Sequence, residues 1–108
     1  MKLITTFILT VVLAGCGNLI KSGAIIDAQK ALADGRYKTA LKKTEDATQF
    51  GLSTRDQKAE INYLQGQALE GLGRRDEAIA RYQFVAEQLA DTPHGYLANT
   101  KLHLFNTE

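Results

Sequence analysis

Apolar residues recur with the 3.6-residue period of an α-helix along the chain from about residue 22 onward. No segment shows the period-two alternation or the density of β-branched residues that is typical of a strand. Glycines interrupt the apolar series, and the pattern between the interruptions predicts five helices, over residues 22–34, 37–50, 54–72, 75–91 and 93–105. The expected fold class is all-α, with consecutive helices paired as antiparallel hairpins.

Turn and capping residues lie where the predicted helices begin and end. Gly35 and Gly73 each follow a predicted helix, at a point where the chain must turn back and a positive φ is convenient. Thr54 with Gln57 three residues later is typical of a capping box. Thr92–Pro93 is expected to supply the N-cap and first residue of the last helix.

Two predicted helices carry apolar stripes that indicate a core. The stripe of the third helix consists of Ile61, Leu64, Ala68 and Leu72, and that of the fourth consists of Ala78, Tyr82, Val85 and Leu89. Tyr63 and Phe84 lie off these stripes and are expected to point away from the core.

The N-terminus has the pattern of a secretion signal. Lys2 is followed by thirteen uncharged, mostly apolar residues, 3–15, and then by Cys16. This stretch is shorter than the roughly 20 residues that a transmembrane helix needs, so a permanent membrane-spanning helix is the weaker interpretation.

The residues Leu13-Ala14-Gly15-Cys16 resemble the lipobox of bacterial lipoproteins. The resemblance implies a signal peptide over residues 1–15, a diacylglycerol and a further acyl chain on Cys16, and a tether over residues 16–23. Gly17 stands where inner-membrane lipoproteins of the enteric type often carry Asp, which implies an anchor at the periplasmic face of the outer membrane, although the inner membrane stays open.

The remaining residues, 24–108, contain an internal repeat. Residues 35–41 and 73–79 both read Gly-Arg, three residues, Ala, and an aliphatic residue, at an offset of 38. Residues 63–82 resemble a tetratricopeptide repeat, with Gly66, Ala78 and Tyr82 in register. The resemblance implies about two stacked helical hairpins and a C-terminal capping helix, although Thr44 stands where the first repeat should have an aromatic residue.

In tetratricopeptide domains the first helix of each hairpin lines a concave face that binds extended protein segments. Carried over to this chain, that face consists of Ile25, Gln29, Leu32, Glu60, Tyr63, Gln67 and Glu70. Tyr63 offers a rigid aromatic anchor, and packing against a neighbouring helix is an equally open interpretation. On the last helix, Leu97 and Leu104 are expected to stay available for a partner or for self-association, with the ammonium group of Lys101 in water.

Composition excludes several function classes. Thirteen Lys and Arg against twelve Asp and Glu leave no basic field for nucleic acid, and one Cys excludes an internal disulfide or a multi-Cys metal site. His94 and His103 are nine residues apart and project to opposite sides of one helix, while Ser22 and Ser53 lie outside any nucleophile motif. We therefore expect no catalytic residue, metal or cofactor.

These features lead to two hypotheses of different classes. The first is a lipid-anchored envelope adaptor that binds a partner protein or peptide through the tetratricopeptide-like surface. The second is a structural lipoprotein, a permanent subunit of an outer-membrane secretion, pilus, polysaccharide-export or assembly complex.

Overall fold

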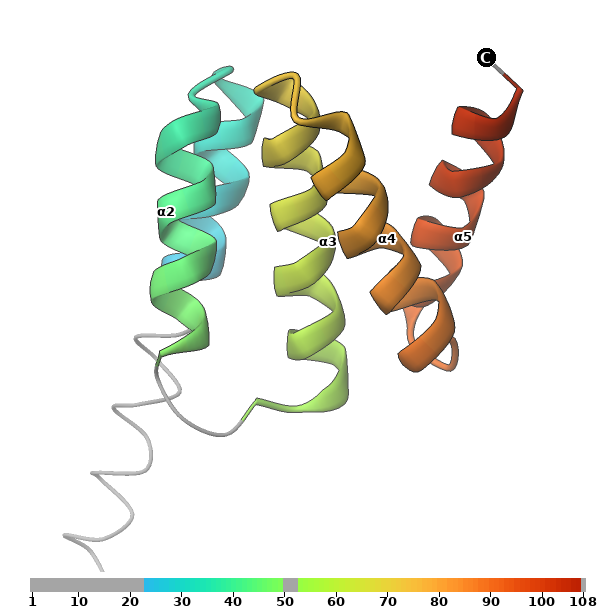
Figure 1. The fold of residues 1–108 in the computed structure, drawn as a ribbon. Helices are drawn as coiled ribbons and strands as arrows, with labels where there is room; N and C mark the ends of the chain where they lie inside the picture. Colours follow the sequence, from blue (N-terminus) through green and yellow to red (C-terminus); the bar gives the residue numbers. More distant parts are fainter. Residues whose placement is uncertain (1–22, 50–52, 108) are drawn as a thin grey trace, which may run out of the picture.

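The structure is a computed structural model that describes residues 23–49 and 53–107. Within those ranges the chain forms five helices and no strand (Figure 1), which confirms the all-α prediction. The first, called here the N-terminal helix, covers residues 23–33. It is followed by α2 (Tyr37–Thr48), α3 (Arg55–Gly71), α4 (Arg75–Gln88) and α5 (Pro93–Asn106).

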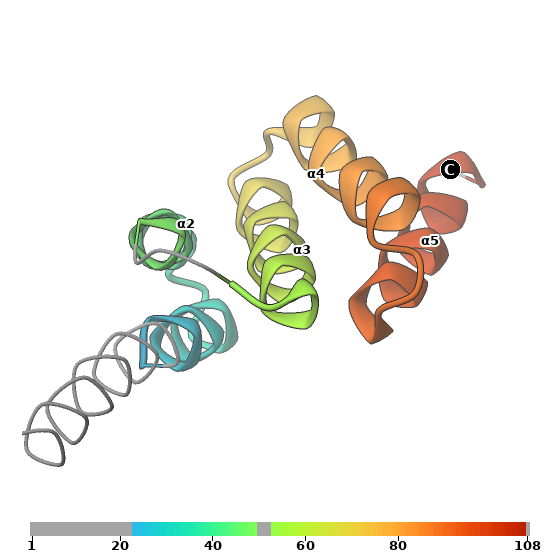
Figure 2. The ribbon, with the colours of Figure 1, turned by 90° about the horizontal axis from the view of Figure 1, so that it is seen from below.

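The helices form two layers. Consecutive helices run antiparallel, and α3 contacts α2 and α4, while α5 packs on α4 and touches α3. Seen from below in Figure 2, α2 and α4 lie on one side of the molecule, and the N-terminal helix, α3 and α5 lie on the other. We call these the two-helix layer and the three-helix layer. Helix α3 lies between α2 and α4 and has extensive contacts with both, so it is the main connection between the first hairpin and the second.

The turns after the N-terminal helix and after α3 have the same hydrogen bonds. Gly35 and Gly73 have φ values of +75° and +76°, as expected from the sequence. In each turn the glycine N–H donates to the carbonyl three residues earlier, and the N–H of the next residue, Arg36 or Arg74, donates to the carbonyl five residues earlier. The internal repeat at an offset of 38 residues is therefore also a repeat of turn geometry.

Side-chain caps begin α3 and α5 as predicted. Thr54 Oγ1 accepts from the N–H of Gln57, whose side chain accepts from the N–H of Thr54, at 3.1 and 3.2 Å. Thr92 Oγ1 accepts from the N–H of Gly95 at 3.0 Å, with Pro93 as the first residue of α5. Helix α4 ends three residues earlier than predicted, at Gln88. The carbonyl of the next residue, Leu89, accepts from the N–H and the hydroxyl of Thr92 at 3.1 and 2.6 Å, and the backbone of Gly95 lies close to it.

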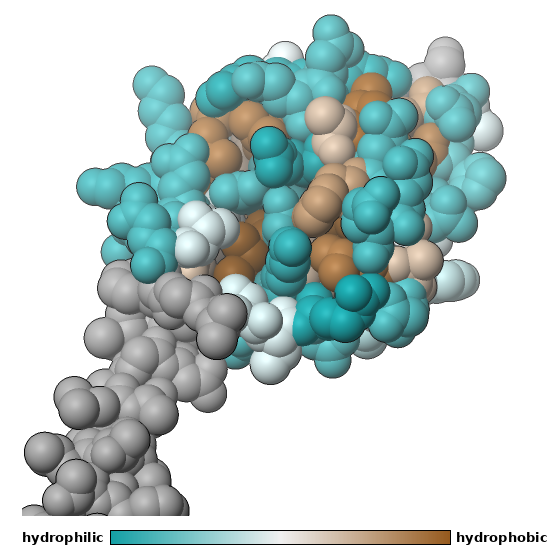
Figure 3. All heavy atoms as spheres, turned by 60° about the horizontal axis from the view of Figure 1, so that its bottom comes forward, coloured by the Kyte–Doolittle hydropathy of each residue, from teal (hydrophilic) through white to brown (hydrophobic). Residues whose placement is uncertain are grey.

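The core consists of small residues and a few large ones. Between α3, α4 and α5 a cluster contains Ala59, Leu69, Ala78, Tyr82, Val85, Leu89 and Ala98, and between the N-terminal helix, α2 and α3 another contains Ile25, Ala28, Ala47, Ile61 and Leu64. Both predicted stripes are buried except for Leu72, which is half-buried. Polar side chains cover most of the face seen in Figure 3, and apolar residues show between them.

Tyr63 and Phe84 do not point away from the core, as the sequence had suggested. Both are half-buried against the cluster between α3, α4 and α5. Helix α5 packs on α4 and also touches α3. A wider arc of the surface of α3 and of α4 is therefore buried than a single hairpin would bury.

The crossing of α3 and α4 depends on Gly66 and Tyr82. A Cβ atom on Gly66 would lie 2.5 Å from a ring carbon of Tyr82, and the Tyr82 side chain is fully buried. At the positions 38 residues earlier the chain has Ala28 and Thr44, which are also buried. The larger aromatic ring of the second hairpin is therefore accommodated by the absence of a side chain at residue 66.

Replacing Ala78 by leucine is expected to lower the free energy of unfolding by about 1–3 kcal/mol. Ala78 is fully buried in the cluster between α3, α4 and α5, so a larger side chain must push helices apart. The matched control is Ala80→Leu on the same helix, because Ala80 is exposed. Urea denaturation checks both variants, and equal midpoints would contradict a tight crossing at Ala78.

Candidate functional site

A shallow hollow lined by residues of the three-helix layer and by Tyr37 of α2 brings together part of the predicted binding face. Its volume is about 280 Å³, and it is lined by Leu32, Tyr37, Gln67, Glu70, Gly71 and Lys101. Leu32, Gln67 and Glu70 were predicted from the sequence. Tyr37 was not singled out, although its side chain closes one side of the hollow. Its ring occupies the space that a side chain at Gly71 would fill.

Glu70 is the polar centre of this hollow. Its Oε1 atom accepts a hydrogen bond from the hydroxyl of Tyr82 at 2.7 Å and lies 3.2 Å from the ammonium nitrogen of Lys101. Burial raises the pKa of Tyr82 far above the usual phenol range, and the hydrogen bond to Glu70 adds to this rise. Tyr82 therefore stays protonated as a hydrogen-bond donor, and the same carboxylate oxygen is held by Tyr82 of α4 and Lys101 of α5.

The sequence-based expectation for Lys101 was wrong. Its ammonium group is not free in water but paired with Glu70, and the two side chains are 29% and 32% exposed. The reason is tertiary, since α3 and α5 are far apart in sequence but touch within the same layer. The pair links the last helix to the centre of the predicted binding face.

Tyr63 is packed between helices. Its ring centroid lies 5.4 Å from that of Tyr82 and 5.4 Å from that of His94. Burial is the main cause of a raised Tyr63 pKa. Of the two interpretations left open by the sequence, packing against neighbouring helices is the one that the structure displays.

Ile25, Gln29 and Glu60 do not line the hollow. Ile25 is only 7% exposed and belongs to the core between the N-terminal helix, α2 and α3, so its placement on a binding face was wrong. Its side chain packs where the first hairpin meets α3. Gln29 donates to Glu60 at 2.7 Å, which ties the N-terminal helix to α3.

Leu97 and Leu104 are exposed, at 42% and 58%, as the sequence predicts. Tyr96, which is not among the residues predicted from the sequence, is 72% exposed. It lies eight residues before Leu104, with Thr100 midway, and this i, i+4 spacing was the signal that could have identified it.

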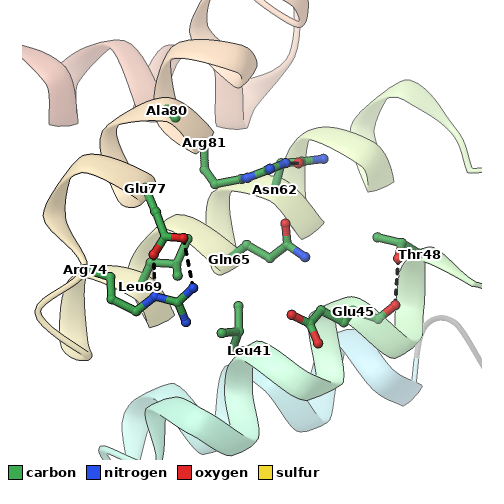
Figure 4. A pocket seen from close by; sticks show the side chains of 10 residues that line it. All are labelled: Leu41, Glu45, Thr48, Asn62, Gln65, Leu69, Arg74, Glu77, Ala80 and Arg81. Atoms are coloured by element: carbon green, nitrogen blue, oxygen red, sulfur yellow. Dashed lines mark hydrogen bonds and ion pairs between the residues drawn. The ribbon is translucent and has the colours of Figure 1, made fainter.

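A second groove runs between α2 and α4 over α3 (Figure 4). Its volume is about 390 Å³, and its walls include Leu41, Glu45, Asn62, Gln65, Arg74, Glu77 and Arg81. The Arg74 guanidinium is paired with the Glu77 carboxylate and holds the pKa of that carboxyl below its usual value. Arg81 donates to the Asn62 side chain at 3.3 Å. Figure 4 marks the first of these pairs, which lies at the start of α4, whereas the second joins α4 to α3 at the floor of the groove.

Cys16 and the lipobox lie outside the residues that the structure describes. Within the described ranges, 23–49 and 53–107, no helix is long and apolar enough to cross a membrane. The same ranges hold no group of three His, Cys, Asp or Glu side chains suited to a metal ion. No protein-family model, curated protein or solved structure matches the chain.

Proposed function

We propose that this chain is a lipid-anchored adaptor of the bacterial envelope, held at the periplasmic face of the outer membrane. In this proposal Cys16 carries the lipid, and the three-helix layer binds a partner protein or peptide without catalysis. The observation that carries the binding role is the hollow, because it joins Leu32, Gln67 and Glu70 from two separate helices. The lipobox residues Leu13–Cys16 support the anchor.

In the same proposal the helical domain consists of tetratricopeptide-like repeats. Two features 38 residues apart support this assignment, namely the equal turns at Gly35 and Gly73 and the fully buried alanines at Ala40 and Ala78. The close approach of Gly66 to Tyr82 agrees with the roles that the resemblance implies for these residues. Helix α5 then acts as the capping half-repeat.

The hollow has the chemistry of a site for an extended peptide. Leu32 and Tyr37 offer apolar contact, the Gln67 amide can donate to and accept from a peptide backbone, and Glu70 with Lys101 offers a charged edge. Tyr82 and Lys101 already fix the Glu70 carboxylate. Little side-chain order therefore has to be gained on binding, which favours affinity.

The alternative is a structural subunit of an outer-membrane secretion, pilus, polysaccharide-export or assembly complex. The exposed side chains Tyr96, Leu97 and Leu104 on α5 favour it, because a permanent contact covers such residues. In that case α5, and not the hollow, would be the main partner contact.

Photo-crosslinking in intact cells distinguishes the adaptor from the structural subunit. A photoreactive amino acid at Gln67 is expected to give a covalent adduct with a protein other than this chain. Changing Glu70 to Gln in the same background is expected to reduce the adduct about tenfold, which corresponds to about 1.4 kcal/mol of binding free energy. Glutamine keeps the size of the side chain and an acceptor for Tyr82, so the fold should persist.

The matched control places the photoreactive group at Gln83, which is exposed on α4 in the opposite layer. Adducts of equal yield from Gln83 would contradict a specific site in the hollow. Adducts from Tyr96 and none from Gln67 would favour the structural subunit instead.

A further inference from the structure

Helix α5 carries an uncharged stripe along its outer side. The stripe, called here the α5 stripe, consists of Pro93, Leu97, Thr100 and Leu104, with Tyr96 at its edge. Leu97 and Leu104 are 42% and 58% exposed, and Tyr96 is 72% exposed. The one Lys, Arg, Asp or Glu residue of α5 is Lys101, whose ammonium group is paired with Glu70.

Two threonine hydroxyl groups near the stripe, those of Thr100 and Thr107, donate hydrogen bonds within the helix itself. Thr100 Oγ1 donates to the Tyr96 carbonyl at 3.1 Å, and Thr107 Oγ1 donates to the Leu104 carbonyl at 2.9 Å. Covering the stripe therefore leaves neither hydroxyl without a hydrogen bond. It also buries no unpaired charge, so the usual costs of burying polar groups are small here.

The two ends of the helical stack differ in chemistry. Helix α5 forms one end, and the N-terminal helix with α2 forms the other (Figures 1 and 2). The second end presents exposed charged residues, including Asp27, Lys30, Asp34, Lys38 and Lys42. Stacking α5 of one molecule on this end of the next would desolvate these charges. Head-to-tail growth is therefore disfavoured, whereas α5 against α5 brings two uncharged surfaces together.

We propose that the α5 stripe binds the α5 stripe of a second copy of this chain, as a parallel pair with a two-fold axis along the helices. Leu97 and Leu104 are seven residues apart with Thr100 between them, the spacing that keeps a seam facing a parallel partner helix. Each of these residues then faces the same residue of the second copy.

The parallel direction rests on the proposed lipid anchor. A two-fold axis along the helices places both N-terminal helices at equal height, so both chains leave toward the same side. Gly23 lies seven positions after Cys16, and a segment of that length spans at most about 25 Å. Two anchored copies side by side on one membrane can therefore pair in this way without either domain turning over.

The pair is expected to depend on membrane anchoring. Two leucines and a threonine from each chain bury less than the roughly 1,200–2,000 Å² of a stable interface. Anchoring raises the effective concentration of one copy near another, which lets a weak contact form. The test therefore uses the full chain in its own membrane.

Three single variants, Leu97→Cys, Thr100→Cys and Leu104→Cys, are oxidised in membranes and examined for disulfide-linked dimers. In a parallel pair each introduced thiol meets its counterpart, so all three variants should form dimers. The matched control is Asn99→Cys, which is exposed on the same helix but lies about 160° from Leu97 around its axis. Each stripe variant should give at least ten times more dimer than this control.

Other results would overturn the proposal in distinct ways. Dimer yields equal to that of Asn99→Cys would show that α5 does not pair. Cross-linking of Leu97→Cys with Leu104→Cys, and of neither with itself, would show antiparallel pairing instead. The unaltered chain tests the lipid anchor separately. If Cys16 carries no lipid, its thiol is free, and the unaltered chain would then form a dimer through Cys16 or take up no palmitate label.

A double variant tests the seam itself. Adding Leu104→Glu to Thr100→Cys is expected to reduce the dimer about tenfold, because two carboxylates would face each other.

Discussion

Replacing Cys16 by alanine is expected to abolish membrane association and to leave the precursor uncleaved. Alanine offers no sulfur for a thioether bond, so no acyl chain can be attached. Each buried CH₂ group contributes about 0.8 kcal/mol to membrane binding, and a single chain gives an association constant of only about 10⁴ M⁻¹. Loss of all chains should therefore move the protein from the membrane fraction to the soluble fraction. Fractionation with palmitate labelling measures both effects.

The matched control is Gly17→Asp, which changes the residue after the cysteine and keeps the sulfur. This variant should still incorporate palmitate, and under the proposed sorting it should shift toward the inner membrane. An unaltered chain that takes up no palmitate would refute the lipid anchor. A labelled Gly17→Asp variant that stays in the outer membrane would refute the sorting alone.

Replacing Tyr82 by alanine is expected to lower the free energy of unfolding by about 3–5 kcal/mol. The side chain is fully buried, and its ring lies 5.4 Å from that of Tyr63 and 6.1 Å from that of Phe105. A cavity would form where α3, α4 and α5 meet, and Glu70 would lose a hydrogen bond. Since small domains have about 5–15 kcal/mol of stability in total, this loss removes a large share of it. Denaturation followed by circular dichroism measures the loss.

Two controls separate the ring from the hydroxyl. Tyr82→Phe keeps the ring and removes the hydrogen bond to Glu70, at a cost of about 1.5–3 kcal/mol for a bond to a charged group. Tyr96→Ala removes a side chain that is 72% exposed, and its effect should stay within about 0.5 kcal/mol. If Tyr82→Ala were no less stable than Tyr96→Ala, the packing described around Tyr82 would be wrong.

The helices and their beginnings could be predicted because their signals are local. The φ values of Gly35 and Gly73 and the caps at Thr54 and Thr92 involve residues only a few positions apart. The end of α4 was predicted three residues too late. Apolar periodicity continues through Leu89, but the carbonyl of that residue accepts from Thr92, the N-cap of the next helix.

The candidate site was predicted only in part. Transferring positions by the 38-residue offset placed Leu32, Gln67 and Glu70 on one face, and all three line the hollow, but the same transfer treated Ile25 and Tyr63 as equivalents. In the structure Tyr63 packs with His94 of α5, whereas Ile25 packs in the core with the first hairpin. Positions related by the 38-residue offset therefore have unequal surroundings, because the first hairpin lies at one end of the series of packed helices and the second is packed on both sides.

The sequence by itself determined the all-α class, the turns and caps, and the buried stripes of α3 and α4, because helical periodicity and chain reversal act within a few residues. The tertiary structure decided which polar groups meet. The contact of Lys101 with Glu70 joins residues 31 positions apart, and that of Tyr82 with Glu70 depends on the crossing at Gly66. Such contacts follow from the distance between packed helices, which no local pattern contains.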